Sequence, residues 1–347
     1  MAGELYTTRE LVSLYDSRVL DAPTAFLRDT FFSNRHNSDS EEVVFDKIKS
    51  RRKIAPFVAA NLPGKARAMR GSESVSYAPP YVKPLITIKP NDAIKRRPGE
   101  RLSGEMGPDQ RWDMLVQQAM EDNEDEITRR EEVMCSEVLR TGGLSIAGQA
   151  SHPDVTVDFG RAATQTKALT STARWGEAGV SPWADIRSWA TLVGSNKGGV
   201  VKDVVLGTSA ADLLLDDPDF RALLDNRRQA GGEMQLAGFA GEAPGYHAVR
   251  LGAVGQYTFW QYQQTFEDDA GDDVDVWPEY ACGLFAPAYM QGWMAYGAIL
   301  DTKSMVPTDR FPKMWEEDNP SGANVMTQSA PLPLIENVNS TFYASVR

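Results

Sequence analysis

The chain has 347 residues, of which 42% are hydrophobic and 24% are charged, and its formal net charge is −12. These values are typical of a soluble globular protein, and the length excludes a single small core and favours two domains or more. The first twenty residues contain Glu4, Glu10 and Asp16 and no apolar stretch of signal-peptide length. They therefore do not indicate secretion, and a cytoplasmic origin is expected.

Charge is distributed very unevenly along the chain. Between Lys47 and Arg101 there are fourteen Lys or Arg and three acids, a local net charge of +11, which leaves −23 on the rest. Oppositely charged surfaces on one polypeptide attract when copies pack head to tail, and that geometry generates rings or lattices. The pattern indicates self-assembly, with a nucleic-acid-binding arm or a solvated basic loop as the alternatives.

The N-terminal hundred residues predict short elements without a core of their own. Thr8 is placed to cap a helix over 9–15, and Pro23 to open a second one that continues through Phe32. The polar remainder of the first fifty residues has the composition of an arm that orders only against another surface. From 45 to 97, apolar alternation and frequent prolines predict edge strands or an extended hairpin that projects and finds partners.

One long helix is predicted over 107–141, because Pro108 and Asp109 favour a helix start and Gly142 and Gly143 a stop. Apolar residues recur between them at spacings of four and seven, and the length is about 50 Å at 1.5 Å per residue. Its outer face is expected to be dense in acid, either as a solvated face or as a contact surface. These acids are Asp109, Asp113, Glu121, Asp122, Glu124, Asp125, Glu126, Glu131, Glu132 and Glu137.

The next region predicts alternating strands and helices. A strand is expected over 155–159, followed by a helix with Ser181 as N-cap and Pro182 at its first position. A buried strand over 200–206 and a helix that begins at Thr208 or Ser209 form a βα unit.

A second group of strands, over 246–258 and 260–266, leads into an acidic hairpin tip at 267–275 with six acids and no base. The spacing of these acids departs from that of a calcium loop, so a solvated tip is the favoured interpretation. The uncharged stretch 280–300 is long enough to span a bilayer, but Pro287 and three glycines interrupt it. Two buried strands are expected there.

The sequence offers little material for catalysis. Only three histidines are present, and no nucleophile elbow, zinc-protease motif or phosphate-binding loop is found. Cys135 and Cys282 fit no metal spacing and are predicted to be free buried thiols. No enzyme activity, cofactor or metal is therefore expected, although a pair of catalytic carboxylates remains an alternative that sequence alone does not test.

Several short strings, in register over nearly the whole length, resemble the lambda-type tailed-phage major capsid protein; 160–280 is the least similar part. The strings are Tyr6-Thr7-Thr8 with Leu11, Phe26-Leu27-Arg28 with Phe31-Phe32, Arg70-Gly71-Ser72, Tyr81-Val82-Lys83-Pro84, Arg96-Arg97-Pro98, Phe311-Pro312-Lys313 with Trp315, and Gln328-Ser329-Ala330-Pro331-Leu332. The resemblance implies an α+β protein with the Hong Kong 97-type capsid fold. On this chain it implies an N-terminal arm at 1–45, an extended loop (the basic β-hairpin) at 46–104, the spine helix and first part of a peripheral domain at 105–180, an axial domain at 181–304, and C-terminal strands of the peripheral domain at 305–347.

The same resemblance implies a structural role. Hexamers and pentamers would build an icosahedral shell that encloses packaged phage double-stranded DNA in the virion, after assembly in the host cytoplasm. Because only five residues precede Tyr6, the scaffolding protein is expected to be separate. A small decoration protein on the outer surface and a portal at one vertex are the other implied partners. An acidic wall would hold DNA without adhering to it. No pair of residues for a Lys to Asn cross-link is identified, and no membrane contact is expected.

Contacts between subunits are predicted to join the basic hairpin to acidic surface on an adjacent copy. The chosen residues are Arg70, Lys83, Lys95, Arg96 and Arg97 on the hairpin and Glu121, Glu124 and Glu126 on the long helix. The alternative function is an oligomeric nucleic-acid-binding protein that uses the hairpin. The few aromatic residues there, Phe57, Tyr77 and Tyr81, argue against base stacking.

Overall fold

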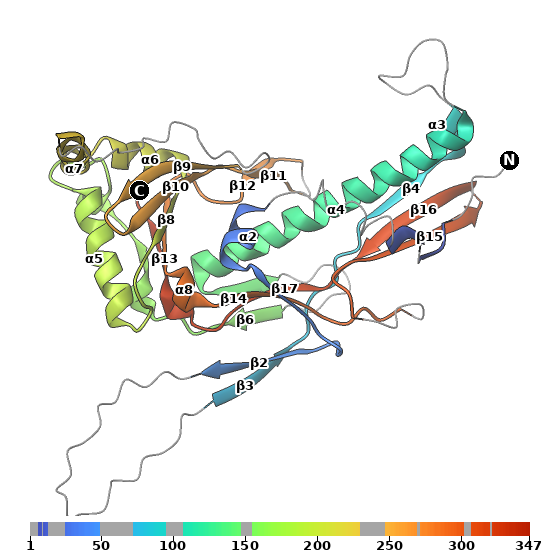
Figure 1. The fold of residues 1–347 in the computed structure, drawn as a ribbon, viewed down its shortest axis with the longest axis horizontal. Coiled ribbons are helices and arrows are strands. Elements are labelled where there is room, and N and C mark those ends of the chain that lie inside the picture. The colour runs from blue at the N-terminus through green and yellow to red at the C-terminus, as the bar shows by residue number, and fades with distance from the viewer. Residues whose placement is uncertain are drawn as a thin grey trace, which may run out of the picture.

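The computed structural model describes residues 6–8, 10–12, 25–48, 72–94, 107–146, 155–229, 247–268, 271–301, 307–319 and 321–347. Within them the chain has mixed helix and sheet architecture, as predicted. Helix α4 runs through the molecule, with one sheet along its N-terminal half and a larger, helix-covered sheet beyond its C-terminal end (Figure 1). The described residues include no helix that is both long and apolar enough to cross a membrane.

The predicted long helix is confirmed as α4 (Pro108–Thr141), which has 34 residues. Pro108 occupies its first turn, and Gly142 ends it in a left-handed conformation with φ 77°. The Arg161 guanidinium donates hydrogen bonds to the carbonyls of Leu139 and Arg140. A cation at these carbonyls satisfies acceptors that have no partner within the helix and complements the helix dipole.

A three-stranded antiparallel sheet covers the N-terminal half of α4. Its order is β15 (Phe311–Asp318), β16 (Ser321–Gln328) and β4 (Leu85–Ile88), so the proline-flanked strand lies at an edge as expected. Alternate residues of the sheet pack on the helix in one core cluster that includes Leu11, Ile88, Val116, Met120, Met314 and Val325. The predicted helix 9–15 falls partly outside the described residues, but residues 10–12 are helical.

The larger sheet has six strands in the order β7 (Thr166–Ala168), β18 (Thr341–Ser345), β13 (Ala281–Phe285), β8 (Asp203–Leu206), β10 (Tyr257–Tyr262) and β9 (Ala248–Val254). Helix α6 (Thr208–Leu215) begins directly after β8, which confirms the βα unit, and α7 (Pro218–Gln229) follows it. Strand β10 pairs with β8 in parallel. The buried strand is shorter than expected, because β8 begins at Asp203 and Val200 is exposed.

Helix α5 (Pro182–Ser195) has the predicted N-cap, since the Ser181 side chain accepts a hydrogen bond from the Ala184 N–H. It buries Ile186, Trp189 and Val193 in the core cluster of the six-stranded sheet. The Trp189 ring stacks on Phe342 of β18 with ring centroids 5.0 Å apart.

A third sheet joins distant parts of the chain, with β14 (Gly292–Tyr296) between β1 (Asn34–Asn37) and β17 (Pro331–Ile335). Stretch 280–300 therefore forms two buried strands, as predicted, with α8 (Pro287–Met290) between β13 and β14. Residues 34–37 of the predicted arm pair in parallel with β14, so this part of the arm orders against a distant strand of its own chain.

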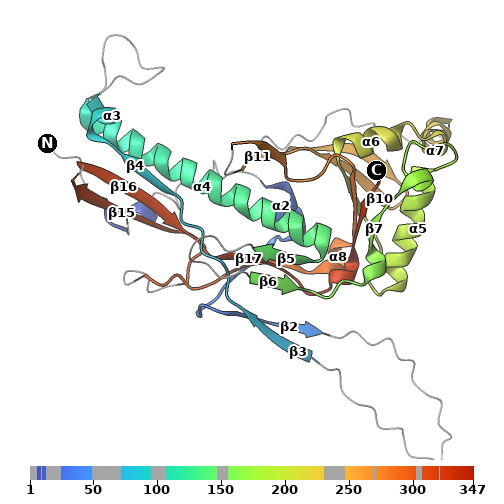
Figure 2. The same cartoon turned by 180° about the vertical axis from the view of Figure 1, so that it is seen from behind.

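Two hairpins lie on opposite sides of the molecule. The hairpin β2 (Val43–Ile48) and β3 (Ser72–Tyr77) projects away from the body, as predicted for this part of the chain (Figures 1 and 2). Residues 49–71 and 95–106 of the basic segment lie outside the described residues. Strands β11 (Thr265–Glu267) and β12 (Asp273–Asp275) form the predicted acidic hairpin on the opposite side of the molecule.

The remaining described elements are short. They are α2 (Phe26–Phe31), α3 (Pro90–Ile94), the antiparallel pair β5 (Gly143–Ile146) and β6 (Val155–Asp158), and 3-10 turns at Ala163–Gln165, Ser171–Ala173 and Val338–Ser340. Cys135 on α4 and Cys282 on β13 are free and buried, as predicted.

Strands on either side of the expected domain boundary at residue 305 pair in common sheets. Strand β18, which follows that position, lies inside the six-stranded sheet, and β14, which precedes it, pairs with β17. The N-terminal, central and C-terminal parts of the chain are thus interleaved in common sheets and do not fold as successive blocks.

Candidate functional site: charged surfaces and a buried ion cluster

The structure separates the predicted contact residues into three groups. Lys83 is exposed, with its ammonium 4.8 Å from the centroid of the Tyr81 ring. Glu121 and Glu126 are exposed on α4. Glu124 is engaged within its own chain, where it accepts a hydrogen bond of 2.7 Å from Nε of Arg310. The other basic residues, Arg70, Lys95, Arg96 and Arg97, lie outside the described residues.

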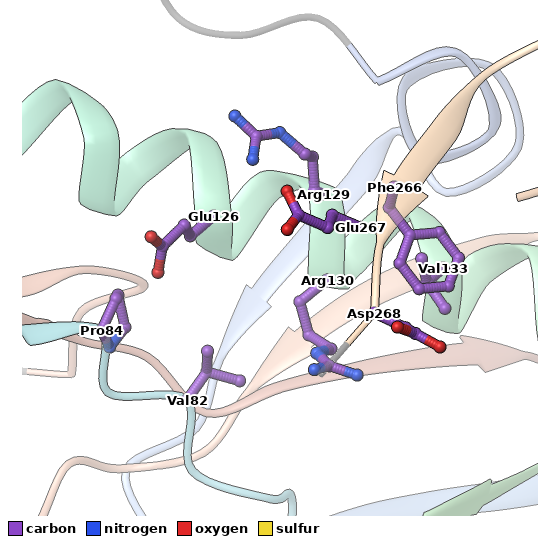
Figure 3. A pocket seen from close by; sticks show the side chains of 9 residues that line it. All are labelled: Val82, Pro84, Glu126, Arg129, Arg130, Val133, Phe266, Glu267 and Asp268. Carbon is purple, nitrogen blue, oxygen red and sulfur yellow. The ribbon is translucent and has the colours of Figure 1, made fainter. Parts of the chain in front are cut away.

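A half-open pocket of about 360 Å³ brings together two acidic features that were predicted separately. Glu126 lies on its α4 wall, and Glu267 and Asp268 of the acidic hairpin lie on the opposite wall (Figure 3). Arg129 and Arg130 also line it, and Val82, Pro84, Val133 and Phe266 supply apolar surface. Such a pocket can hold a long charged side chain, with the aliphatic stem on the apolar surface and the head among charges of opposite sign.

Beneath the acidic face of α4 lies a buried ion cluster. Glu131 is 0% exposed and accepts hydrogen bonds from Nη1 of Arg28, at 2.9 Å, and from Nη1 of Arg310, at 2.8 Å. Arg28 also binds Asp29 at 2.9 Å, and Arg310 also binds Glu124. The cluster joins α2, α4 and the segment that leads into β15.

Glu132, also 0% exposed, holds the N-terminus of α2. Its carboxylate accepts hydrogen bonds from the backbone N–H groups of Leu27, at 2.8 Å, and Arg28, at 3.0 Å. The Tyr262 hydroxyl donates a third, at 2.7 Å. Helix α2 has Ala25 at its N-cap and no side-chain cap of its own, so a residue 105 positions away performs that role.

The pKa values of these two adjacent carboxyl groups are shifted in opposite directions. Burial opposes the charge of Glu131, but Arg310 and Arg28 outweigh it and lower the pKa of that carboxyl. Burial raises the pKa of Glu132, and the hydrogen bonds from Tyr262 and α2 offset this only in part. A full positive charge within hydrogen-bonding distance thus decides the sign.

Assignment of Glu131 and Glu132 to the outer acidic face was therefore wrong. The signal that could have placed Glu131 inside is its position four residues after Ile127 and three before Met134, both buried on the inner face. No comparable local signal identifies its partners, because Arg28 and Arg310 are 103 and 179 residues away.

The described residues contain no group of three or more His, Cys, Asp or Glu side chains arranged to hold a metal ion. The buried carboxylates are fully used by structural hydrogen bonds. The exposed charges can form electrostatic contacts with another protein surface. The buried ion pairs stabilise the subunit that carries them.

Comparison with known proteins supports the same conclusion. The major capsid protein of Escherichia phage N15 is 28% identical over 341 residues, which cover 95% of this chain and 96% of that protein. The major capsid protein of Escherichia phage lambda is 26% identical over 340 residues, with coverage of 95% and 96%. These relatives are structural capsid proteins, and they confirm the resemblance to lambda-type major capsid proteins.

Solved structures agree in fold. A crystal structure of a protein assigned as the capsid protein of an Escherichia coli CFT073 prophage has a TM-score of 0.77 at 19% identity, covering 99% of this chain and 100% of that chain. The mature capsid protein of bacteriophage PhiM1 has a TM-score of 0.50 at 12% identity, with coverage of 93% and 87%. A family model described as phage major capsid protein E matches residues 14–346, and the chain therefore belongs to the phage major capsid protein E family.

Proposed function

We propose that this structural protein of the phage capsid has the Hong Kong 97-type fold and closes hexamers and pentamers into an icosahedral shell around packaged double-stranded DNA. The observation that carries the proposal is the uneven distribution of charge along the chain, together with the positions of two hairpins. The hairpin β2–β3, which flanks residues 49–71 of the basic segment in the sequence, projects from one side of the subunit, and the acidic hairpin β11–β12 lies on the other (Figures 1 and 2). Surfaces that complement each other across a subunit favour head-to-tail association, which closes into rings.

In this proposal the basic hairpin of one subunit crosses acidic surface of the next. Lys83 and the basic residues 70 and 95–97 would face Glu121, Glu126 and the pocket that Glu267 and Asp268 line. Glu124 is left out, because its partner is Arg310 of the same chain. Each exposed pair is worth only about 0.2 to 1 kcal/mol, so the contact depends on repetition around the capsomer.

The finer assignments remain part of the proposal. The projecting hairpin supports the extended loop at 46–104, and the position of α4 supports a spine helix within 105–180. The arm at 1–45, the axial domain at 181–304 and the C-terminal strands of the peripheral domain at 305–347 complete the proposed division, with β18 assigned to the sheet of the axial domain. A separate scaffolding protein, a small decoration protein and a portal are the partners that the family resemblance supports. The acidic excess of the chain supports a wall that encloses DNA without adhering to it.

The direct test is negative-stain microscopy of the chain expressed alone and together with a phage scaffolding protein. The proposal expects ring-shaped capsomers or closed shells that sediment much faster than a monomer. A chain that stays monomeric under both conditions and binds DNA with strong salt dependence would contradict the proposal and favour the nucleic-acid-binding alternative.

A further inference from the structure

A rigid apolar corner lies at the C-terminal end of α5. Tyr289 and Val200 are 50% and 56% exposed, which is high for large apolar side chains. The Tyr289 ring lies against the backbone of Gly199, where a Cβ atom would come within 2.2 Å of it, and Gly199 has φ +91°. Only glycine fits this position, so the chain holds the ring in place while half of it faces solvent.

Backbone strain is concentrated at the same corner. Among the described residues, three other than glycine have positive φ, and two of them, Lys197 at 69° and Gln291 at 48°, flank Tyr289 and Val200. The Asn337 amide nitrogen donates to the Lys197 carbonyl at 3.3 Å and helps to hold the turn. Backbone strain of this kind accumulates at functional sites. We call Lys197, Val200, Lys202 and Tyr289 the Tyr289 corner.

A second exposed corner of opposite charge lies at the N-terminal end of α5. Leu215 is 38% exposed at the end of α6, between the exposed acids Asp212, Asp216 and Asp219. Asp216 pairs with Arg221, so the negative charge available to a partner is that of Asp212 and Asp219. We call Asp212, Leu215, Asp216 and Asp219 the α6–α7 corner.

Helix α5 separates the two corners, and hydrogen bonds fix its position. The Asp217 carboxylate accepts hydrogen bonds of 3.0 Å from the Ser181 hydroxyl and from the Trp183 N–H, which ties the start of α5 to the α6–α7 junction. The 14 residues of α5 correspond to about 20 Å. Helix α8 and the basic hairpin lie on one side of the molecule, and α6 and the acidic hairpin lie on the other, in both views of the fold (Figures 1 and 2).

We infer that the Tyr289 corner of one copy docks on the α6–α7 corner of the next copy and forms a second head-to-tail contact within a capsomer ring, in addition to that of the basic hairpin. The inference rests on the proposed function and assigns its partner surfaces. A rigid tyrosine is a typical interface anchor, because it buries a large area at little entropic cost. The exposed lysines of one corner complement the exposed aspartates of the other, which sets the register of the contact.

Two charge-reversal variants test this contact. K197E/K202E reverses the Tyr289 corner, and D212K/D219K reverses the α6–α7 corner. Each alone should form far fewer rings than the wild type in sedimentation velocity and negative-stain images, with a ring contact weakened by more than about tenfold, because like charges then meet at every contact. Thermal unfolding of K197E/K202E should match that of the wild type, and D212K/D219K should unfold at a slightly lower temperature, because Asp219 is the acid in the first turn of α7.

The decisive sample is an equal mixture of the two variants. The reversed Tyr289 corner of K197E/K202E then meets the reversed α6–α7 corner of D212K/D219K. The native Tyr289 corner of D212K/D219K meets the native α6–α7 corner of K197E/K202E, so the two variants alternate around the ring. Alternation closes only with an even number of subunits, so rings of six should return while rings of five do not. A single chain that carries all four substitutions keeps the wild-type net charge and should recover both.

The outcomes separate the contact from the proposed function. If the wild type forms rings and both variants do so equally well, or if neither the mixture nor the fourfold variant recovers them, the assigned contact is wrong and the capsid function stands. Y289A should also weaken ring formation while Y289F preserves it, and equal assembly of the two would overturn the anchor role. A wild type that forms no ring or shell in any condition overturns the proposed function and the contact together.

Discussion

Replacement of Glu131 by Gln should destabilise the subunit strongly, although the two side chains have almost the same shape. Glu131 is fully buried and bridges Arg28 and Arg310, whose side chains are 8% and 3% exposed. The variant removes a carboxylate that both guanidinium groups share, while Asp29 remains beside Arg28 and Glu124 beside Arg310. Removal of one partner of a buried ion pair costs about 3–5 kcal/mol. Glutamine still accepts a hydrogen bond, so a loss of about 3 kcal/mol in the free energy of unfolding is expected.

The measurement is equilibrium unfolding in urea, with thermal unfolding as a second readout in which the midpoint should fall by about 4 °C. The matched control is E126Q, one helical turn and a residue earlier on the exposed face of α4, which should change stability by less than about 0.5 kcal/mol. Hydrogen exchange should rise in α2 of E131Q, because its anchor to α4 is weakened. If E131Q and E126Q unfold alike, the buried cluster contributes no net stability and the reasoning is refuted.

Three further predictions concern charge at other positions. Reversal of Arg96 and Arg97 to Glu should leave thermal unfolding of the monomer nearly unchanged and slow shell assembly in light scattering; normal particles would contradict electrostatic docking of the basic hairpin. Replacement of Asp272 and Asp273 by Asn should leave soluble expression and the circular dichroism spectrum intact, because the acidic tip is exposed and is expected to project toward solvent or a symmetry axis; insoluble protein would mean that the tip is structural. Burial raises the pKa of Glu132 above 4.5, so the folded chain binds this proton more tightly than the unfolded chain. The wild type should therefore lose unfolding free energy relative to E132Q as pH rises through the folded pKa. A difference between the two proteins that stays constant with pH would contradict the raised pKa.

Local signals in the sequence were sufficient for elements whose ends are fixed by their own residues. The proline at the start of α4 and the glycine at its end define a 34-residue helix without reference to anything else. The same holds for α5, where Ser181 and Pro182 set the first turn, and for the interrupted stretch that became β13 and β14.

Features that depend on distant partners were not predictable in this way. The spacing of Glu131 from Ile127 and Met134 favours the inner face of α4, but its role as a bridge depends on two arginines that lie far away in the sequence. Similarly, nothing near residues 34–37 indicates the free edge of β14. Of the candidate site, sequence reasoning identified the charge division and the exposed acids, while the pocket and the ion cluster required the fold.

The position of β18 has a consequence for synthesis of the protein in the cell. This strand, at Thr341–Ser345, lies between β7 and β13, so the six-stranded sheet has a missing inner strand until almost all of the described chain has left the ribosome. Until then β7 has no partner and one edge of β13 is unpaired, and such nascent chains are prone to aggregate. The large separation in sequence between paired strands also predicts slow folding. Newly made subunits would therefore acquire their mature surfaces only after β18 has been made, which delays polymerisation on the ribosome and makes early folding a step where host chaperones can act.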